Sequence, residues 1–208
     1  MKVLITGITG NVGSHLADYI LNNHQDIELH GIARWRSPMD NIEKIKHKIN
    51  IELADLNDFS SLIYIMNKIK PDYIFHLAAQ SLVRESYEKP VETFSTNILG
   101  TVNVLDCIRN STTVKGCIVY TSDKSYENVG TKQVYTENDR LGGNDPYSAS
   151  KASSELITKS YYHSFLKNLT KSVGTARAGN VIGGGDFGEN RLVPDIFDSI
   201  FKKFIIVF

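Results

Sequence analysis

Three glycines near the start of the chain, Gly7, Gly10 and Gly13, limit its possible folds more than any other feature. They follow the apolar run 2–6, typical of a buried strand, and they open the amphipathic segment 11–22, typical of a helix. A strand that turns through glycines into a helix leaves free N–H groups and the positive end of the helix dipole at the turn. Such a loop can cradle a pyrophosphate, so the pattern predicts dinucleotide binding; the alternative is a glycine turn that serves packing alone. The expected cofactor contacts here are Gly7, Thr9, Gly10, Asn11, Val12 and Gly13.

The rest of the chain alternates short apolar runs with longer amphipathic stretches. This alternation predicts an α/β fold, a Rossmann-like doubly wound parallel sheet with helices on both faces. The expected strands are 2–6, 27–33, 50–53, 73–77, 116–121 and 171–176, and the expected helices are 11–22, 57–69, 91–109, 146–166 and 192–201.

A change in character near residue 178 predicts a domain boundary. Residues 1–178 would form an NAD(P)-binding domain, and residues 179–208 would begin a substrate-binding region that is incomplete. The Gly-rich polar stretch 179–191 is expected to be a long functional loop. The segment from Lys202 to the last residue, Lys-Lys-Phe-Ile-Ile-Val-Phe, ends in an apolar run and is expected to begin a strand. Because natural termini are usually polar, the end of the chain inside this run predicts a chain that has been cut short.

The composition argues against several classes of protein. Lys and Arg number 23, as do Asp and Glu, and a net charge of zero gives no support for nucleic acid or a membrane surface as the main partner. No apolar run approaches the roughly 18 residues that a membrane span needs, and the first residues resemble a strand rather than a signal peptide. Cys107 and Cys117 lack metal-ligand spacing. We therefore expect a cytoplasmic protein with buried reduced thiols and no metal.

Two separated motifs predict a redox site. Tyr147 and Lys151 are four residues apart, so on a helix they share one face. A nearby ammonium favours the phenolate and lowers the tyrosine pKa, so the pair could take a proton from a hydroxyl while a cofactor takes a hydride. Ser122 and Asp123 would lie at the end of the strand before that helix. Asp123 adds an acid that hydride transfer alone does not require.

The end of the second expected strand bears on the choice of cofactor. An acidic residue there would suit the ribose hydroxyl of NAD, but Glu28 lies at the start of the strand, and the end carries Arg34 and Arg36. Guanidinium groups bind phosphate in a forked geometry, so the sequence favours NADP over NAD. The alternative is that both arginines are solvated surface residues. Asp55 and Leu56, after the third strand, are expected to meet the adenine edge.

Four motifs together resemble the extended short-chain dehydrogenase/reductase family. They are the glycine loop, Leu77-Ala78-Ala79, Asn97 within Ser-Thr-Asn-Ile-Leu-Gly-Thr, and Tyr147-x-x-x-Lys151. Within that family, segments 122–127, 141–147 and 177–186 resemble the nucleotide-sugar 4,6-dehydratases, most of all the CDP-glucose branch. Segment 34–38 is more similar to the GDP-mannose branch. The further cofactor contacts that the resemblance implies are Leu77, Ala78, Ala79, Asn97, Thr121, Tyr147 and Lys151. His76 is expected to be a structural core residue.

The resemblance implies an internal redox elimination. Tyr147 would remove the proton of the sugar 4-hydroxyl while Ser122 bonds the 4-oxygen, and Lys151 would lower the Tyr147 pKa and hold the nicotinamide ribose. Asp123 would protonate the leaving 6-hydroxyl. Lys124 stands where many dehydratases have the Glu that takes the C5 proton, although the CDP-glucose branch is similar in having Lys. Lys124 is then either that base, which requires a lowered pKa, or a residue that orders Asp123.

Substrate contacts and partners follow from the same resemblance. The expected contacts with a nucleotide sugar are Gln80, Arg84, Asn180 and Arg191, each with the alternative of a surface or loop-ordering role. Helices 91–109 and 146–166 resemble the four-helix seam of a homodimer. Two other functions stay open: a nucleotide-sugar 4-epimerase, which has no need of an acid at Asp123, and an inactive dinucleotide-binding domain.

Overall fold

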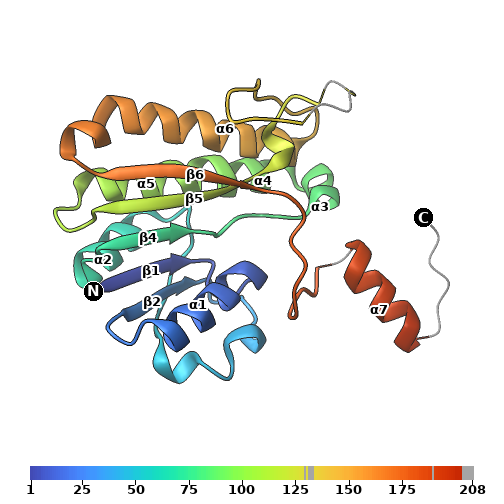
Figure 1. The fold of residues 1–208 in the computed structure, drawn as a ribbon, viewed down its shortest axis with the longest axis horizontal. Helices are drawn as coiled ribbons and strands as arrows, with labels where there is room; N and C mark the ends of the chain where they lie inside the picture. Colours follow the sequence, from blue (N-terminus) through green and yellow to red (C-terminus); the bar gives the residue numbers. More distant parts are fainter. Residues whose placement is uncertain (129, 131–133, 189, 203–208) are drawn as a thin grey trace.

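The computed structural model describes residues 1–128, 130, 134–188 and 190–202. Within them, parallel strands form one sheet in the order β3-β2-β1-β4-β5-β6 (Figure 1). Their bounds are β1 Lys2–Thr6, β2 Glu28–Ala33, β3 Asn50–Leu53, β4 Tyr73–His76, β5 Gly116–Ser122 and β6 Ser172–Ala178. The strand order reverses between β1 and β4, which opens a crevice at the carboxyl edge of the sheet. The predicted doubly wound α/β fold is confirmed.

Helices cover both faces of the sheet. Figure 1 shows α1 in front of the strands and α5 behind them. The helices are α1 Asn11–Asn23, α2 Phe59–Ile69, α3 Val83–Glu88, α4 Pro90–Phe94, α5 Gly100–Asn110, α6 Pro146–Tyr161 and α7 Leu192–Lys202. Successive residues of a strand point to opposite faces, so Ile5 packs with Ala17 of α1, whereas Leu4 packs in the core that α2 and α5 close. Cys107 and Cys117 lie in this second core as free, buried thiols, as expected.

Two long helices differ from their predicted form. The expected helix 91–109 is α4, a π-helical turn Ser95–Leu99, and α5, and the expected helix 146–166 ends in a second π-helical turn, Tyr162–Leu166. Helix α3 was not predicted, because its six residues, Val-Arg-Glu-Ser-Tyr-Glu, are too few and too polar to show a helical period. The other boundaries agree to within two residues.

The chain leaves the sheet after β6. Residues 179–188, 190 and 191 form no helix or strand, which agrees with the predicted loop, and they run along the carboxyl edge to α7, which stands apart from the sheet (Figure 1). Lys202 belongs to α7 rather than to the expected strand, and residues 203–208 lie outside the described part of the chain. Among the residues described, no helix is both long enough and apolar enough to cross a bilayer.

Candidate active site

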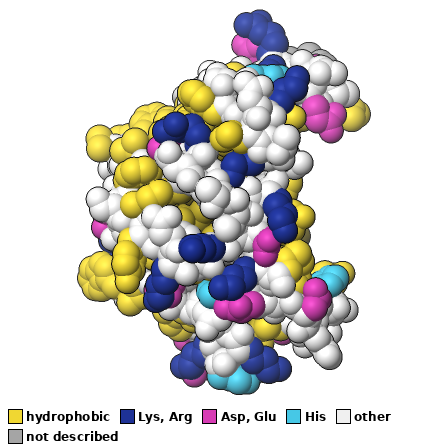
Figure 2. Space-filling model, turned by 90° about the vertical axis from the view of Figure 1, so that its left-hand side faces the viewer, with side chains coloured by type: hydrophobic (Ala, Val, Ile, Leu, Met, Phe, Trp, Pro, Cys, Tyr) yellow, Lys and Arg dark blue, Asp and Glu magenta, His cyan; other side chains and the backbone are white. Residues whose placement is uncertain are grey.

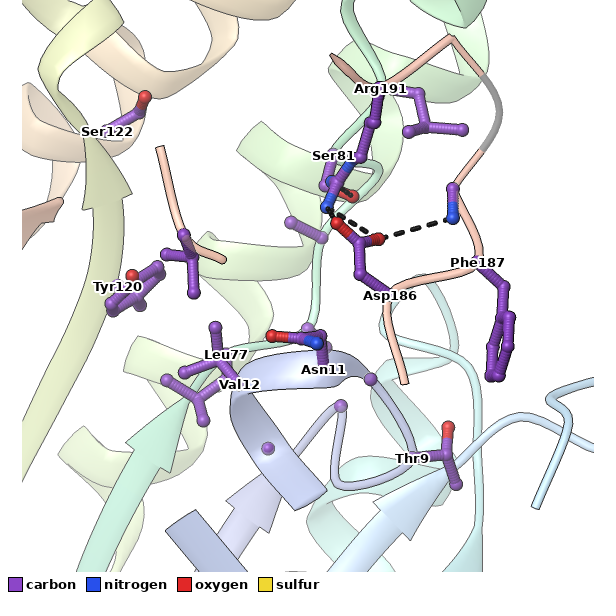
Figure 3. Close-up of a pocket in the computed structure, with 18 of the residues that line it drawn as sticks. Thr9, Asn11, Val12, Leu77, Ser81, Tyr120, Ser122, Asp186, Phe187 and Arg191 are labelled. Carbon is purple, nitrogen blue, oxygen red and sulfur yellow. Dashed lines mark hydrogen bonds and ion pairs between the residues drawn. The ribbon is translucent and has the colours of Figure 1, made fainter. Parts of the chain in front are cut away.

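A cavity of about 730 Å³ lies at the carboxyl edge of the sheet (Figure 3). Its wall combines the glycine loop, the ends of β2, β4 and β5, the first turns of α6 and the loop after β6. The predicted site residues in this wall are Gly7, Thr9, Gly10, Asn11, Val12, Gly13, Arg34, Asp55, Leu56, Leu77, Ala78, Ala79, Arg84, Thr121, Ser122, Lys124, Tyr147, Lys151, Asn180 and Arg191. Segments far apart in the sequence thus form one continuous surface.

The glycine loop has the geometry that a pyrophosphate requires. Gly7 has a φ of +71°, and a Cβ there would lie 2.7 Å from the backbone of Ala78. A Cβ on Gly13 would lie 2.3 Å from the carbonyl oxygen of Gly7. The turn and helix α1 can therefore lie this close to each other only with glycine at these positions. Gly10 is the N-cap and supplies no side chain to the first N–H groups of α1. These donors and the helix dipole face the cavity, so the chain fits the phosphates of a dinucleotide.

The two predicted redox motifs meet at one end of the cavity. Ser122 is the last residue of β5, and its hydroxyl accepts a hydrogen bond from Lys124 N at 3.2 Å and donates one to Asp123 Oδ1 at 3.2 Å. Tyr147 lies in the first turn of α6, is buried, and hydrogen-bonds to Ser122. Asp145 caps this helix by accepting from Ser148 N at 2.9 Å. Asp123 is exposed beside the cavity rather than in its wall.

The electrostatics of Tyr147 differ from the prediction. Burial raises its pKa, and the opposing hydrogen bond with Ser122 and the charge of Arg191 do not outweigh that burial. Lys151 is not among the groups that shift the Tyr147 pKa, and its Nζ donates to the carbonyl oxygen of Tyr120 at 3.1 Å. Burial also lowers the Lys151 pKa to about 8, although the charge of Glu155 acts in the other direction. The expected effect of Lys151 on the Tyr147 pKa is therefore wrong for this geometry.

One of the two predicted cofactor-selecting arginines lies elsewhere. Arg34 lines the cavity, but Arg36 does not. Its guanidinium group lies 3.6 Å from Glu92 and 3.9 Å from Asp55, with both ion pairs partly exposed. A guanidinium already paired with carboxylates is a weaker ligand for an added phosphate.

Asn97 and Gln80 support the site from behind. The side chain of Asn97 is buried, accepts from Gln80 N at 2.8 Å, and donates to Gln80 O and to Ser150 Oγ, each at 2.9 Å. The side chain of Gln80 is bonded to Leu82 and Thr93. Neither residue belongs to the cavity wall, so the contacts of Asn97 with cofactor and of Gln80 with substrate stay predictions. In this structure Asn97 holds the segment after β4 against α6.

The predicted substrate residues of the loop after β6 reach the cavity, but one is already engaged. Figure 3 shows Arg191 directed at Asp186 and Ser81. Its Nη1 lies 2.9 Å and 3.0 Å from the two carboxylate oxygens of Asp186, and its Nη2 donates to Ser81 Oγ at 3.2 Å. Arg84 donates to Asn190 Oδ1 at 2.8 Å. A substrate phosphate would compete with Asp186 for Arg191. Asp186 lies within a motif that the sequence singled out, although no role was assigned to it.

A buried ion pair behind α6 was also missed. Glu155, one turn after Lys151, accepts from Thr121 Oγ1, from Thr175 Oγ1 at 2.7 Å, and from Arg177 Nη2 at 3.0 Å. Burial raises the Glu155 pKa, but these hydrogen bonds outweigh it, so that the net shift is downward. The sequence signal that could have revealed Glu155 was its spacing from Lys151, because a residue at i+4 lies on the same helix face.

His76 has the structural role expected of it. It is buried, and its ring nitrogens lie 2.8 Å from Thr6 Oγ1 and 3.3 Å from Thr101 Oγ1. Burial, aided by the nearby charge of Lys151, lowers its pKa to about 3. A neutral imidazole therefore joins β1, β4 and α5 beneath the cavity.

Comparison with known proteins identifies the family. The model of the family described as GDP-mannose 4,6 dehydratase matches residues 4–176. The chain belongs to this family. Among curated members, CDP-glucose 4,6-dehydratase of Salmonella typhimurium is 38% identical over 204 residues, which are 95% of this chain and 57% of that protein. GDP-mannose 4,6 dehydratase of Drosophila melanogaster is 37% identical over 133 residues, covering 59% of this chain and 33% of that one. The chain thus spans little more than half the length of the Salmonella relative.

Solved structures agree on the fold. The dTDP-glucose 4,6-dehydratase DesIV of Streptomyces venezuelae, solved with NAD and TYD bound, matches with a TM-score of 0.87 at 24% identity, over 98% of this chain and 63% of that one. UDP-glucose 4-epimerase of Thermotoga maritima matches with a TM-score of 0.85 at 23% identity, over 97% and 63%. Dehydratases and epimerases therefore share this architecture, and the fold alone does not separate the two reactions.

Proposed function

We propose that this chain carries the hydride-transfer site of a nucleotide-sugar 4,6-dehydratase that acts on CDP-glucose. The observation that carries the proposal is the meeting of Ser122, Tyr147 and Lys151 in the wall of the cavity that also contains the glycine loop, with Asp123 directly after Ser122. The choice of CDP-glucose is supported by the Salmonella relative of that name and by Lys124, which resembles the CDP-glucose branch at this position.

The glycine loop, Arg34 and Asp55 would hold the dinucleotide, and Lys151 would hold its nicotinamide ribose. When bound, the cofactor supplies a hydride acceptor for the sugar C4 and later a hydride donor for C6. The chain's own residues move protons. Tyr147 must first lose its phenolic proton, which burial opposes by raising its pKa; the phenolate then accepts the proton of the 4-hydroxyl while the Ser122 hydroxyl bonds the 4-oxygen.

Elimination then requires an acid and a base on the same sugar. Asp123 donates a proton to the departing 6-hydroxyl, and Lys124 accepts the proton from C5, so that water leaves the sugar. Lys124 lines the cavity and is exposed, whereas Asp123 stands beside it, 3.2 Å from Ser122. An ammonium group must first lose its proton to act as a base, which makes Lys124 the residue on which the C5 step depends.

The proposed cofactor preference rests on Arg34. Its place in the cavity wall at the end of β2 supports recognition of a 2′-phosphate, hence NADP. Arg36 adds little, because Glu92 and Asp55 already neutralise it. Asp55 also brings a carboxylate into the wall, which opposes a phosphate. We propose NADP as the preferred cofactor, with NAD accepted at the same site.

The proposal includes assembly, location and domain organisation. Large hydrophobic side chains are exposed on α4, on α6 and on the adjoining π-helical turns, namely Val91, Phe94, Leu99, Leu156 and Phe165. Figure 2 shows hydrophobic side chains gathered along one flank of the molecule. Pairing of these helices with those of a second copy would bury this surface in a homodimer.

The free thiols suit a reducing cytoplasm. Residues 179–208 would begin the region that binds the sugar nucleotide.

Two observations favour a second substrate, GDP-mannose. The family model that matches residues 4–176 is described by that activity, and segment 34–38 is more similar to that branch. An epimerase is disfavoured, because it has no use for an acid at Asp123. A chain that binds cofactor without turnover is the remaining alternative, since the curated relatives are longer.

The test is incubation of the chain with CDP-glucose, GDP-mannose or dTDP-glucose, each with NAD or NADP, followed by detection of the 4-keto-6-deoxy product by its absorbance in alkali. Product from CDP-glucose, and none from a Tyr147→Phe variant, is expected. Cofactor binding is measured in parallel by quenching of protein fluorescence. Binding without product from any of the three sugars would overturn the dehydratase proposal and leave a cofactor-binding domain.

A further inference from the structure

The segment Gly183–Gly185 lies against the glycine loop, although some 170 residues of chain separate the two. Figure 1 shows the chain descending from β6 along the edge of the sheet towards α1. The side-chain amide of Asn11, at the start of α1, donates to Gly183 O at 3.3 Å and to Gly184 O at 3.1 Å. We call Gly183–Gly185 the strap. Its backbone passes over the helix N-terminus at which a pyrophosphate would bind.

A second donor joins the strap to the other side of the glycine loop. The amide nitrogen of Asn41, in a 3₁₀ turn between β2 and β3, donates both to Thr9 O at 3.1 Å and to Gly185 O at 3.0 Å. Gly185 has a φ of +84°, and a Cβ at this position would lie 2.2 Å from Asn41 Oδ1. Only glycine allows the strap to lie this close to Asn41. One amide thus holds the two walls of the cavity together.

A third donor binds the strap from outside the cavity. His15 Nε2 lies 2.9 Å from Gly184 O, and because a carbonyl can only accept, Nε2 carries the proton. His15 is one turn after Asn11 on α1 and does not line the cavity. Its contact with the strap is therefore separate from any contact with a bound dinucleotide.

We propose that the strap encloses the pyrophosphate of the bound dinucleotide, and that Asn41 and His15 are positioning residues that slow release of the cofactor. The inference rests on the proposed function, in which one cofactor molecule takes the hydride and gives it back. Gly10, Asn41 and Gly185 all line the same cavity, so the phosphates would lie between the loop and the strap. A dinucleotide can leave this space only after the strap has lifted, which breaks the bonds from Asn11, Asn41 and His15.

The test measures release of NADH and NADPH by stopped-flow fluorescence, with an excess of unlabelled NAD or NADP as the competitor. Loss of one or two hydrogen bonds is expected to speed release by about threefold in His15→Ala and about tenfold in Asn41→Ala. His47→Ala is the matched control, because His47 is exposed in the turn Lys46–Lys48, away from the strap, and release should stay unchanged. Circular dichroism establishes that each variant is folded.

A double variant tests whether Asn41 and His15 act on the same segment. If both residues act through the strap, Asn41→Ala combined with His15→Ala should speed release by less than the product of the single effects. Unchanged release in both single variants, with NADH still bound, would overturn the inference and leave the proposed function intact. Faster release in Asn41→Ala alone would overturn it too, since Asn41 would then act on the cofactor directly. Failure of the unaltered chain to bind NADH or NADPH would refute both proposals.

Discussion

The ammonium group of Lys151 donates a hydrogen bond to the backbone carbonyl of Tyr120, 3.1 Å away. Lys151 is on α6 and Tyr120 on β5, and both line the cavity. The bond holds a buried cation against the strand that ends in Ser122. Burial lowers the Lys151 pKa to about 8, which brings its titration close to the pH at which such a site would work.

This lowered pKa predicts how stability depends on pH. Lys151 is protonated below about pH 10.5 in the unfolded chain but only below about pH 8 in the folded one. Between these values the unfolded state binds more protons, so the contribution of Lys151 to stability rises with pH. Relative to Lys151→Met, the wild-type free energy of unfolding should rise by about 1 kcal/mol per pH unit from about pH 8 to 10. Urea unfolding of both proteins measures it, and a constant difference would contradict the lowered pKa.

Substitution of the proposed acid should separate the two chemical stages. Asp123→Asn keeps the size of the side chain and an oxygen able to accept from Ser122, but removes the proton donor. We expect it to slow loss of the 6-hydroxyl by about 100-fold or more while the first hydride transfer changes little. Reduced cofactor should then accumulate transiently after mixing with CDP-glucose. An equal loss of both stages would argue that Asp123 positions Ser122 instead of acting as an acid.

The two arginines at the end of β2 provide a matched pair of variants. Arg34→Ala should weaken NADPH binding by about tenfold more than NADH binding, because it removes a charged phosphate ligand from the cavity wall. Arg36→Ala should change the ratio of the two affinities by less than about twofold, because Glu92 and Asp55 already pair with that residue. Fluorescence titration with each cofactor measures the ratios. The reverse order would show that Arg36 turns towards the cofactor.

The ion pair between Glu155 and Arg177 should stabilise the fold as a unit. Only 4% and 15% of the two side chains are exposed, so removal of one partner leaves a charge without compensation. We expect Arg177→Met to lower the free energy of unfolding by about 3 kcal/mol, and addition of Glu155→Gln to recover part of that loss. Urea denaturation gives the values.

An exposed pair provides the control for that experiment. Lys46→Met, which breaks the surface pair with Glu43, should change stability by less than about 1 kcal/mol. A loss of similar size in Lys46→Met and Arg177→Met would mean that burial does not distinguish the two pairs.

The parts of the site that could be predicted are those that depend on local sequence patterns. Tyr147 and Lys151 share a helix face because four residues complete about one turn, and Ser122 ends a strand that its apolar run already marked. The parts that could not be predicted depend on partners distant in the sequence. The side-chain amide of Asn97 bonds to Gln80, 17 residues away, and to Ser150, 53 residues away, and no local pattern showed these contacts.

The sequence by itself determined the succession of strands and helices along the chain, the glycine loop and the shared helix face of Tyr147 and Lys151, because each is encoded by spacing within a few residues. Only the tertiary structure decided which charged groups are already paired within the protein. It paired Arg36 with Glu92, directed Lys151 to the Tyr120 carbonyl, and brought Gly185 to within 3.0 Å of Asn41, which is 144 residues away. Electrostatics and hydrogen bonding depend on distance in space, and only the packed sheet and helices set those distances.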